Sequence, residues 1–475
     1  MPDVDAVVVG SGPNGLAAAI VLARAGSSVR VVEAADSVGG GARSAELTLP
    51  GFVHDVCSSV HPMGAASRCF RTLRLEAHGL EWAHPPRPLA HPLDDGTAAT
   101  LERSVAGTAA SLGIDGVAYR RLVLPFLSEW EALFDDLLAP PHLPSCPQLL
   151  ARFGVLALRS ARGFCDAFFR GSRASALFAG LAAHSILPLE EPASASYGLV
   201  LALAGHAVGW PFARGGSRAI ADALSSVLRA CGGRIETGRR VSALDELPRG
   251  SIALLDLSPR GVLAVAGSEL PRGYRSRLAR FRHGPGVFKI DWALRAPVPW
   301  RAPECRGAGT VYVGGTLEEI ARAERDVALG RHPERPFVLF AQPCVADPGR
   351  APPGSHVGWA YCHVPARSGA DMTGPVERQI ERFAPGFRDV VLARRTRTAA
   401  QFEEYNPNAV GGDLGGGRGD LRQILFRPVP RLSPYRTPNP RVFLCSASTP
   451  PGGGVHGMCG YHAAKAALSA PASRD

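Results

Sequence analysis

Lysine is almost missing from this chain, although basic residues are common. Of 52 lysines and arginines, only Lys289 and Lys465 are lysines. The formal net charge of +10 is spread along the sequence, and no basic run carries interleaved aromatic residues. Such runs are typical of surfaces that bind nucleic acid. We therefore expect no nucleic-acid partner, and each of the two lysines is a candidate for a specific role.

The sequence also lacks paired cysteines and long apolar segments. None of the ten cysteines stands in a CxxC pair, which argues against zinc, any other metal and dithiol redox sites. No apolar run reaches the roughly 18 residues of a membrane-spanning helix. The stretch Leu199–Trp210 is apolar but short, so it could line a tunnel, join the core or touch a membrane surface. No signal-peptide pattern precedes the first strand, and we expect a cytoplasmic protein with reduced thiols, with peripheral membrane association left open.

A glycine-rich loop near the N-terminus carries the first chemical signal. Ala6–Val9 is a short apolar run typical of a buried parallel strand, and the segment Gly10-Ser11-Gly12-Pro13-Asn14-Gly15 follows it and opens a helix. Gly10 permits the tight turn, Gly12 lets the backbone approach a pyrophosphate, and Gly15 lets the helix pack on the strand. Glu33, at the end of the next strand, can accept hydrogen bonds from ribose hydroxyls. The pattern predicts a dinucleotide site and leaves NAD and FAD both open.

A second glycine cluster follows the ribose-binding acid. Glu33-Ala34 leads through a short spacer to Gly39-Gly40-Gly41-Ala42-Arg43. Here the sequence resembles the FAD-dependent amine oxidase and phytoene desaturase superfamily, in which an acid, a spacer, a glycine pair and an arginine recur. The resemblance implies non-covalently bound FAD, with this cluster along its pyrophosphate and ribityl chain. Amine oxidases usually place the arginine at the position of Gly41, so Arg43 is the expected substitute.

Two later segments extend the resemblance over nearly the whole chain. In the family, a short strand after a helix touches the adenine through its backbone, and Val241 matches that position. The C-terminal glycine-rich turn into a helix would place its backbone N–H groups by the flavin ring, with contacts expected from Gly453, Gly454, Val455 and Met458. The runs 54–62, 284–289, 314–318 and 406–413 resemble the branch called phytoene dehydrogenase-related or pyridine nucleotide-disulfide oxidoreductase-like.

The predicted fold class is therefore α/β. We expect a Rossmann-like FAD-binding domain of the glutathione reductase and amine oxidase type, a mixed-sheet substrate domain and a helical insertion. The FAD-binding domain is predicted to be discontinuous, over residues 1–100, 205–284 and 401–475. Residues 115–200 show helical periodicity, and strand-like runs recur between 285 and 400. The insertion is accordingly placed at 101–204 and the substrate-binding domain at 285–400.

Three residues are candidates for catalysis beside the flavin. Lys289 stands in a predicted strand, and related amine oxidases hold a lysine near flavin N5 through water; it could also be an ordinary charge at the end of a strand. His61 follows the pyrophosphate region and His456 lies inside the C-terminal loop. Each could act in acid–base chemistry, or be a hydrogen-bonded structural histidine. Asp413 lies in a glycine-rich loop that could approach the site, but it is interpreted as a turn residue.

The resemblance implies an oxidoreductase that removes hydride from an apolar or secondary-metabolite substrate to form a double bond. An amine oxidase-type flavin oxidase that uses O2, and a redox-neutral isomerase that uses reduced FAD, stay open as alternatives. Rab escort proteins and GDP-dissociation inhibitors share the expected fold without flavin, but Glu33 and the glycine clusters argue against that class. No second GxGxxG segment indicates a separate NAD(P) domain. The oligomeric state and the electron acceptor are not predicted.

Overall fold

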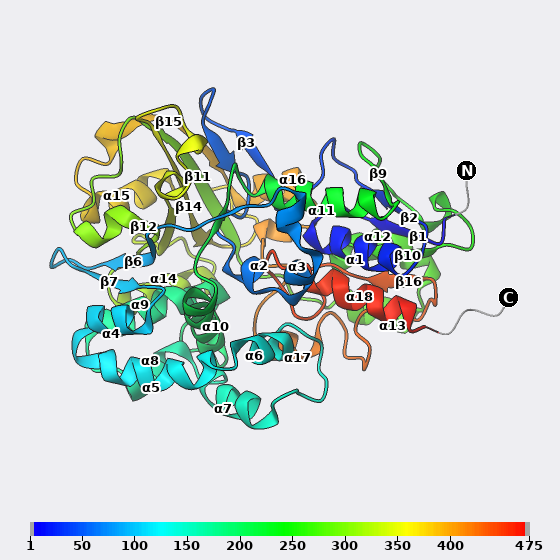
Figure 1. Ribbon diagram of the computed structural model, residues 1–475, viewed down its shortest axis with the longest axis horizontal. Coiled ribbons are helices and arrows are strands. Elements are labelled where there is room, and N and C mark those ends of the chain that lie inside the picture. The colour runs from blue at the N-terminus through cyan, green and yellow to red at the C-terminus, as the bar shows by residue number, and fades with distance from the viewer. Residues whose placement is uncertain (1–3, 471–475) are drawn as a thin grey trace.

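The computed structural model describes residues 4–470, and its secondary structure is organised around two sheets joined by a helical layer (Figure 1). The first sheet has five parallel strands in the order β16-β10-β1-β2-β9. These strands are β1 (Ala6–Val9), β2 (Val29–Val32), β9 (Arg234–Glu236), β10 (Ile252–Leu255) and β16 (Val442–Leu444). Segments from the start, middle and end of the chain thus share one sheet.

Helices α1 (Pro13–Arg24), α11 (Arg218–Ala230) and α18 (Met458–Leu468) lie together beside this sheet (Figure 1). Nearly all of α1 is buried, because it packs against the strands on one side and against α18 on the other. Gly460 allows that approach, since a Cβ there would lie 1.7 Å from the carbonyl oxygen of Asn14. The close contact ties the C-terminal helix to the loop that precedes α1.

The second sheet is mixed and has seven strands in the order β15-β11-β14-β13-β12-β6-β7. Its strands are β6 (Arg87–Pro92), β7 (Ala98–Leu101), β11 (Gly286–Leu294), β12 (Ala308–Val313), β13 (Val338–Ala341), β14 (His356–Val364) and β15 (Val391–Arg397). Only the β6–β12 pair is parallel. The predicted boundary of the cofactor domain at residue 100 differs from the observed sheet. It left β6 and nearly all of β7 in the cofactor domain, whereas their hydrogen bonds place both strands in the second sheet.

The two faces of the second sheet differ in character. Phe288, Ile290 and Trp292 alternate along β11 and point into an apolar core that includes residues of α15 (Thr373–Phe383). The intervening residues face the other way, as the two-residue period of a strand requires. On that second face, Lys289 is in register with Tyr361 of β14, which is in register with Leu339 of β13. Tyr312 of β12 completes the row.

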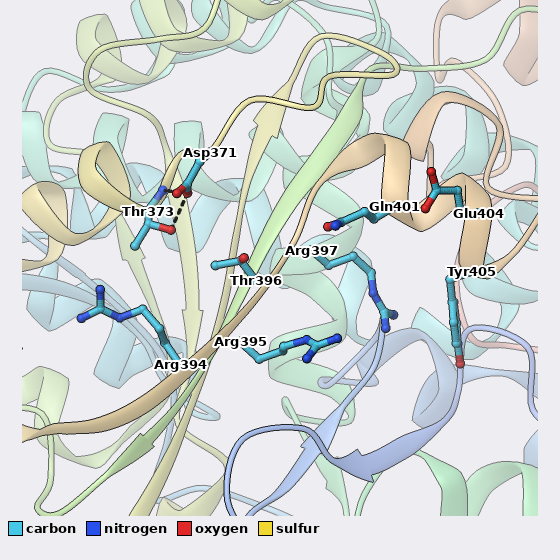
Figure 2. Close-up of a pocket in the computed structure, with 9 residues that line it drawn as sticks. All are labelled: Asp371, Thr373, Arg394, Arg395, Thr396, Arg397, Gln401, Glu404 and Tyr405. Carbon is cyan, nitrogen blue, oxygen red and sulfur yellow. Dashed lines mark hydrogen bonds between the residues drawn. The ribbon is translucent and has the colours of Figure 1, made fainter.

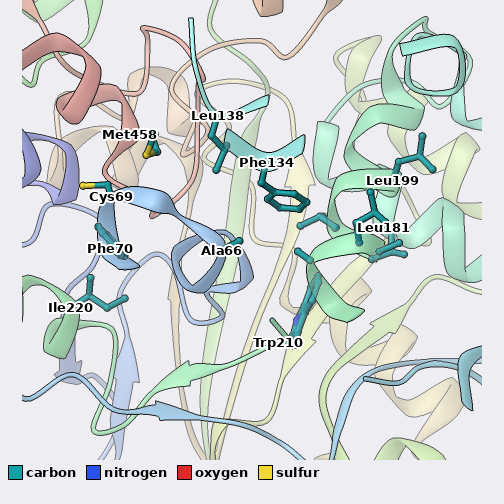
Figure 3. Close-up of a cluster of buried hydrophobic side chains, with 14 of the residues drawn as sticks. Ala66, Cys69, Phe70, Phe134, Leu138, Leu181, Leu199, Trp210, Ile220 and Met458 are labelled. Carbon is teal, nitrogen blue, oxygen red and sulfur yellow. The ribbon is translucent and has the colours of Figure 1, made fainter. Parts of the chain in front are cut away.

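Helices from the middle of the chain cover that second face. They are α4 (Val105–Ser111), α5 (Gly116–Leu127), α6 (Trp130–Leu137), α7 (Pro147–Ala157), α8 (Ala161–Phe168), α9 (Ser172–Ala182) and α10 (Ser194–Ala207). Helices α7 and α8 are separate, since Ser160 accepts the amide N–H of Gly163 at 3.1 Å and begins α8. One apolar cluster runs from Met458 and Cys69 to Phe134 and Leu199 of this layer (Figure 3).

The apolar stretch Leu199–Trp210 belongs mainly to α10 and is buried there. Leu199, Leu203 and Ala204 pack in the core, and Trp210 Nε1 donates a hydrogen bond to Thr310 Oγ1 at 3.1 Å. Of the three roles that the sequence left open, core packing is the one observed for most of these side chains. Within residues 4–470, no helix combines the length and apolarity that crossing a membrane requires.

Candidate active site

One cavity of about 1080 Å³ lies between the two sheets and the helical layer. The loops after β1, β2 and β10 form part of its wall, so it opens at the carboxyl ends of parallel strands, where α/β folds bind their ligands. Another part of the wall comes from the face of the second sheet that carries Tyr361 and from α6, α7 and α10, with Leu137, Phe153 and Val200 as examples, and loops such as 406–409 and 453–456 complete it. A dinucleotide loop and an apolar chamber therefore share one space.

The loop after β1 has the close backbone contacts that its glycines predict. Gly10 adopts φ +103°, a conformation that L side chains rarely take. A Cβ on Gly15 would stand 2.2 Å from the carbonyl oxygen of Gly10, and one on Gly12 would stand 2.7 Å from Oδ2 of Asp256. Helix α1 begins here with Pro13 and has no acidic residue in its first turn. Its N-terminus is thus shaped and charged to hold an anion.

Glu33 lies at the end of β2 with its carboxylate turned toward this loop. The amide N–H groups of Ser11 and Ala35 each donate to it at 2.9 Å. The hydroxyl of Ser11 at 2.6 Å and the guanidinium of Arg43 at 3.4 Å complete its contacts. The two backbone donors are fixed, whereas the two side-chain donors can rotate. Ribose hydroxyls could replace the rotatable pair without any backbone movement.

Asp256, which the sequence reasoning did not select, lies directly beside the loop. Its Oδ2 accepts the N–H of Gly15 at 3.0 Å, across 241 residues of sequence. Loss of hydration raises the pKa of this carboxyl to about 7, and the nearby charge of Glu33 adds to the rise, while the amides of Gly15 and Gly12 oppose it. An ionised Asp256 would stand where a pyrophosphate is expected. Its position directly after β10, a buried strand of the parallel sheet, was the signal available in the sequence.

The second glycine cluster folds over the loop. Gly40 has φ +54°, and a Cβ there would lie 3.0 Å from Cα of Gly12. The side chain of Arg43 donates through Nε to the carbonyl of Val38 at 3.1 Å and approaches the hydroxyl of Tyr405 at 3.4 Å. Gly40, Gly41, Ala42 and Arg43 all line the cavity. Their predicted contacts with a pyrophosphate and ribityl chain stay predictions.

The remaining predicted contacts mostly reach the same wall. Val241, Gly453, Gly454 and Val455 line the cavity, as do Gly10, Gly12, Pro13, Asn14, Glu33 and Ala34. Met458 does not line it, because its side chain is buried in the apolar core beneath the loop (Figure 3). Gly15 also lies behind the wall, where its role is to let the loop close. Asp413 behaves as the turn residue that was expected, since its Oδ1 accepts the N–H of Gly415 at 2.8 Å.

Both candidate histidines line the cavity and are buried. His61 Nε2 is 2.8 Å from Ser217 Oγ, and because that hydroxyl donates to the carbonyl of Ser58, Nε2 carries the proton. Nδ1 of His61 is buried without a hydrogen-bond partner in the described chain. Nδ1 of His456 accepts the N–H of Met458 at 3.1 Å. Loss of hydration lowers the pKa of each imidazole to about 4, so both are neutral at pH 7.

Lys289 is deeply buried but does not line the cavity. Its ammonium pairs with Asp291 two residues along β11, and it lies 5.7 Å from the ring centre of Trp359. Burial lowers the pKa of Lys289 and raises that of Asp291 to about 6, because both charged forms lose hydration. Cys57 and Trp359, which do line the cavity, are its neighbours on that side. The lysine is therefore not a charge at a strand end.

A second cavity, of about 820 Å³, lies outside the first along the edge strand β15. Arg394, Arg395 and Arg397 of β15 line it together with residues of α16 (Ala399–Tyr405) (Figure 2). Tyr405 contributes to both cavities, and the guanidinium of Arg397 lies 4.3 Å from its ring centre. Because this outer cavity is polar and basic, the inner one is the better match for an apolar molecule.

Comparison with known proteins agrees with this geometry. Residues 8–74 match the family model of an NAD(P)-binding Rossmann-like domain. The chain is 27% identical to pyridine nucleotide-disulfide oxidoreductase domain-containing protein 2 of Mus musculus, over 98% of this chain and 93% of that protein. It is 28% identical to phytoene dehydrogenase of Streptomyces griseus, over 94% and 92% of the two chains. The comparisons support the FAD-dependent oxidoreductase family.

Solved structures share the fold. An oxidoreductase from Methanosarcina mazei superimposes with a TM-score of 0.65 at 16% identity, over 98% of this chain and 99% of that one. Cyclohexylamine oxidase from Brevibacterium oxydans gives a TM-score of 0.55 at 16% identity, over 99% and 98%. At these identities the likeness establishes the architecture alone. The α/β fold with a Rossmann-like domain and a mixed sheet is thus confirmed.

Proposed function

We propose that this protein is an FAD-dependent dehydrogenase of the desaturase type, which removes hydride from a largely apolar substrate to form a double bond. The observation that carries the proposal is the single cavity in which the dinucleotide loop and an apolar chamber meet. The similarity to a phytoene dehydrogenase over most of both chains supports the same reaction type.

The residues present fit FAD. The glycines at 10, 12, 15 and 40 let the loop and the second glycine cluster pack closely on each other and on Asp256, and Gly10, Gly12 and Gly40 present bare backbone to the cavity, where a pyrophosphate would approach. Glu33 has two exchangeable side-chain contacts for the ribose. At the other end, the loop before α18 turns through Gly457 at φ +69°, and the backbone amides of Gly453, Gly454 and Val455 belong to the part of this loop that lines the cavity. These amides would stabilise negative charge on a reduced flavin ring. Bound FAD would supply the hydride-accepting chemistry.

The chain itself would bind, orient and shield the substrate. Leu137, Phe153 and Val200 provide an apolar wall that excludes water. His61 and His456 stand neutral in the same wall, and each keeps one buried nitrogen without a hydrogen-bond partner in the described residues. Nδ1 of His61 carries no proton, so it can take up the substrate proton that the formation of a double bond releases, whereas the free Nε2 of His456 carries the ring proton and can only donate a hydrogen bond. Lys289 would not contact the substrate, and its charge would instead shift the electrostatic potential in the cavity.

A spectrum of the purified protein tests the cofactor. We expect a yellow protein whose flavin is released by denaturation as free FAD. A protein that stays colourless after incubation with FAD, or one whose flavin stays attached to the unfolded chain, would contradict the proposal.

Anaerobic reduction tests the reaction. Candidate apolar substrates should bleach the flavin, and the product should have lost two hydrogens. Slow reoxidation in air, with fast reoxidation by a quinone, is expected for a dehydrogenase. Fast reoxidation with hydrogen peroxide formation would identify an oxidase instead. A product isomeric with its substrate, formed only by the reduced protein, would identify the redox-neutral isomerase.

A further inference from the structure

The cavity contains one group of polar side chains that the proposed hydride transfer does not use. His184, in the short turn Ala183–Ser185 after α9, lines the cavity, and so does Tyr361 of β14. His184 contacts Tyr312, which is separated from Tyr361 in the row by Leu339, another residue that lines the cavity. Apolar residues such as Ile186 and Val200 line the same cavity. Polar groups in such a wall are expected to have partners.

The hydrogen bonds of His184 define which group it offers to the cavity. Its Nε2 lies 2.6 Å from the hydroxyl of Tyr312, which is fully buried. That hydroxyl has no other hydrogen-bond partner among the described residues, so donating its proton to Nε2 is the arrangement that satisfies it. Nδ1 of His184 then carries the ring proton. The imidazole therefore presents an N–H donor that no described residue accepts.

Tyr361 offers a second free group. Its ring packs against Trp359 and His363, at centroid distances of 5.4 and 5.6 Å. Its hydroxyl makes no hydrogen bond to a described residue, and the side chain lines the cavity. Behind it, His363 Nδ1 is bonded to both carboxylate oxygens of Glu324, at 2.8 and 2.9 Å. Of this buried pair, His363 packs against the tyrosine ring.

Both free groups are uncharged at neutral pH. Loss of hydration lowers the pKa of His184 to about 3, and the charge of His363 lowers it further. Burial and the carboxylate of Glu324 raise the pKa of the Tyr361 phenol. The acidic residues that line this cavity are Glu33, Asp256 and Asp413, and all three bond to backbone amides of other loops. The wall around His184 thus offers neutral donors and no counter-ion for an ammonium group.

We propose that His184 and Tyr361 recognise a neutral oxygen function, a hydroxyl or a carbonyl, on a substrate that is otherwise apolar. This inference rests on the proposed function and narrows it, since it favours an oxygenated apolar molecule over a pure hydrocarbon and over an amine. Two neutral donors suit an oxygen acceptor, while an ammonium would call for an anion. A carboxylate would call for a cation, and lining arginines such as Arg418 and Arg427 already bond to Glu191 and to backbone carbonyls. Tyr361 can also accept the proton of a substrate hydroxyl.

Binding of four probes of one length tests the proposal directly. Octan-1-ol, octanal, octane and octylamine are titrated into the purified protein, as isolated, by calorimetry. The alcohol and the aldehyde should bind more tightly than the alkane and the amine. Because one neutral hydrogen bond is at stake, Tyr361→Phe should weaken alcohol and aldehyde binding by about three- to tenfold and leave octane binding unchanged. His184→Phe should have the same selectivity of effect.

Tyr119→Phe is the matched control. Tyr119 also bonds a buried histidine, His206 at 2.8 Å, but it does not line the cavity. Tyr119→Phe should leave the affinities for all four probes unchanged. The proposal would be overturned if octylamine bound most tightly, if the alcohol and the alkane bound equally, or if Tyr361→Phe weakened the binding of every probe by the same factor. The titration needs no flavin turnover, so a colourless protein that still prefers the alcohol would refute the FAD assignment while leaving this inference standing.

Discussion

Replacing Asp256 with Asn removes a buried negative charge from the mouth of the dinucleotide loop. The substitution keeps the size of the side chain and an oxygen that can accept the N–H of Gly15, now 3.0 Å from Oδ2. It removes the ability to ionise. Because loss of hydration raises the pKa of Asp256 from 3.8 to about 7, the folded protein favours the protonated carboxyl. The Asp256→Asn variant should therefore have the stability and FAD affinity of the wild type at low pH, and it should exceed the wild type in both at high pH.

The magnitude follows from the two pKa values. The folded state binds the proton more tightly than the unfolded state, so the stabilising contribution of the protonated carboxyl is present at low pH and is lost as pH rises through about 7. Linkage to this one group predicts a loss of about 2 to 3 kcal/mol of unfolding free energy between about pH 5 and pH 8. Asp256→Asn should not show that part of the loss.

Urea unfolding of the flavin-free protein at the two pH values measures this difference. Asp245→Asn, at an exposed position away from the cavity, is the control for removal of a carboxylate. In parallel, FAD titrations should show tighter binding by Asp256→Asn than by the wild type at pH 8, with the two converging at pH 5. The reasoning fails if Asp256→Asn shifts stability equally at both pH values, or if it weakens FAD binding at pH 8.

Three further predictions address the loop, the lysine and the helix contact. Glu33→Arg should lower FAD occupancy of the purified protein, because it places a cation where ribose hydroxyls need an acceptor; Glu33→Gln should lower it less, and unchanged occupancy in both would remove the ribose assignment. Lys289→Met should slow flavin reduction or reoxidation in stopped-flow experiments while FAD stays bound. Because Asp291 would lose its buried partner, the double variant Lys289→Met with Asp291→Asn is measured beside it. Wild-type rates in both half-reactions would exclude a catalytic role for Lys289. Gly460→Ala should cost about 1 to 3 kcal/mol of unfolding free energy, because its Cβ would meet the Asn14 carbonyl at 1.7 Å; Gly273→Ala, where nothing lies within 4 Å, should cost less, and equal losses would refute the packing argument.

Local patterns determined the cofactor end of this protein. The loop Gly10–Gly15 and Glu33 lie within one strand–helix–strand unit, so their spacing alone specifies how they meet. The glycines are required by close backbone contacts inside that unit, and the same holds for Gly40 against Gly12. The apolar strands could likewise be located, because their burial follows from runs of valine, leucine and alanine. These inferences needed no knowledge of distant contacts.

Only the tertiary structure decided the composition of the chamber. Parallel pairing brings Asp256 to Gly15, and strand register sets Tyr312, Leu339, Tyr361 and Lys289 in one row. Register depends on hydrogen bonds between segments that are far apart in the chain, and a sequence pattern does not encode which strands become neighbours. For the same reason the predicted domain boundary left β6 and β7 outside the substrate domain, and the place of Lys289 behind Cys57 and Trp359 could not be predicted from the sequence.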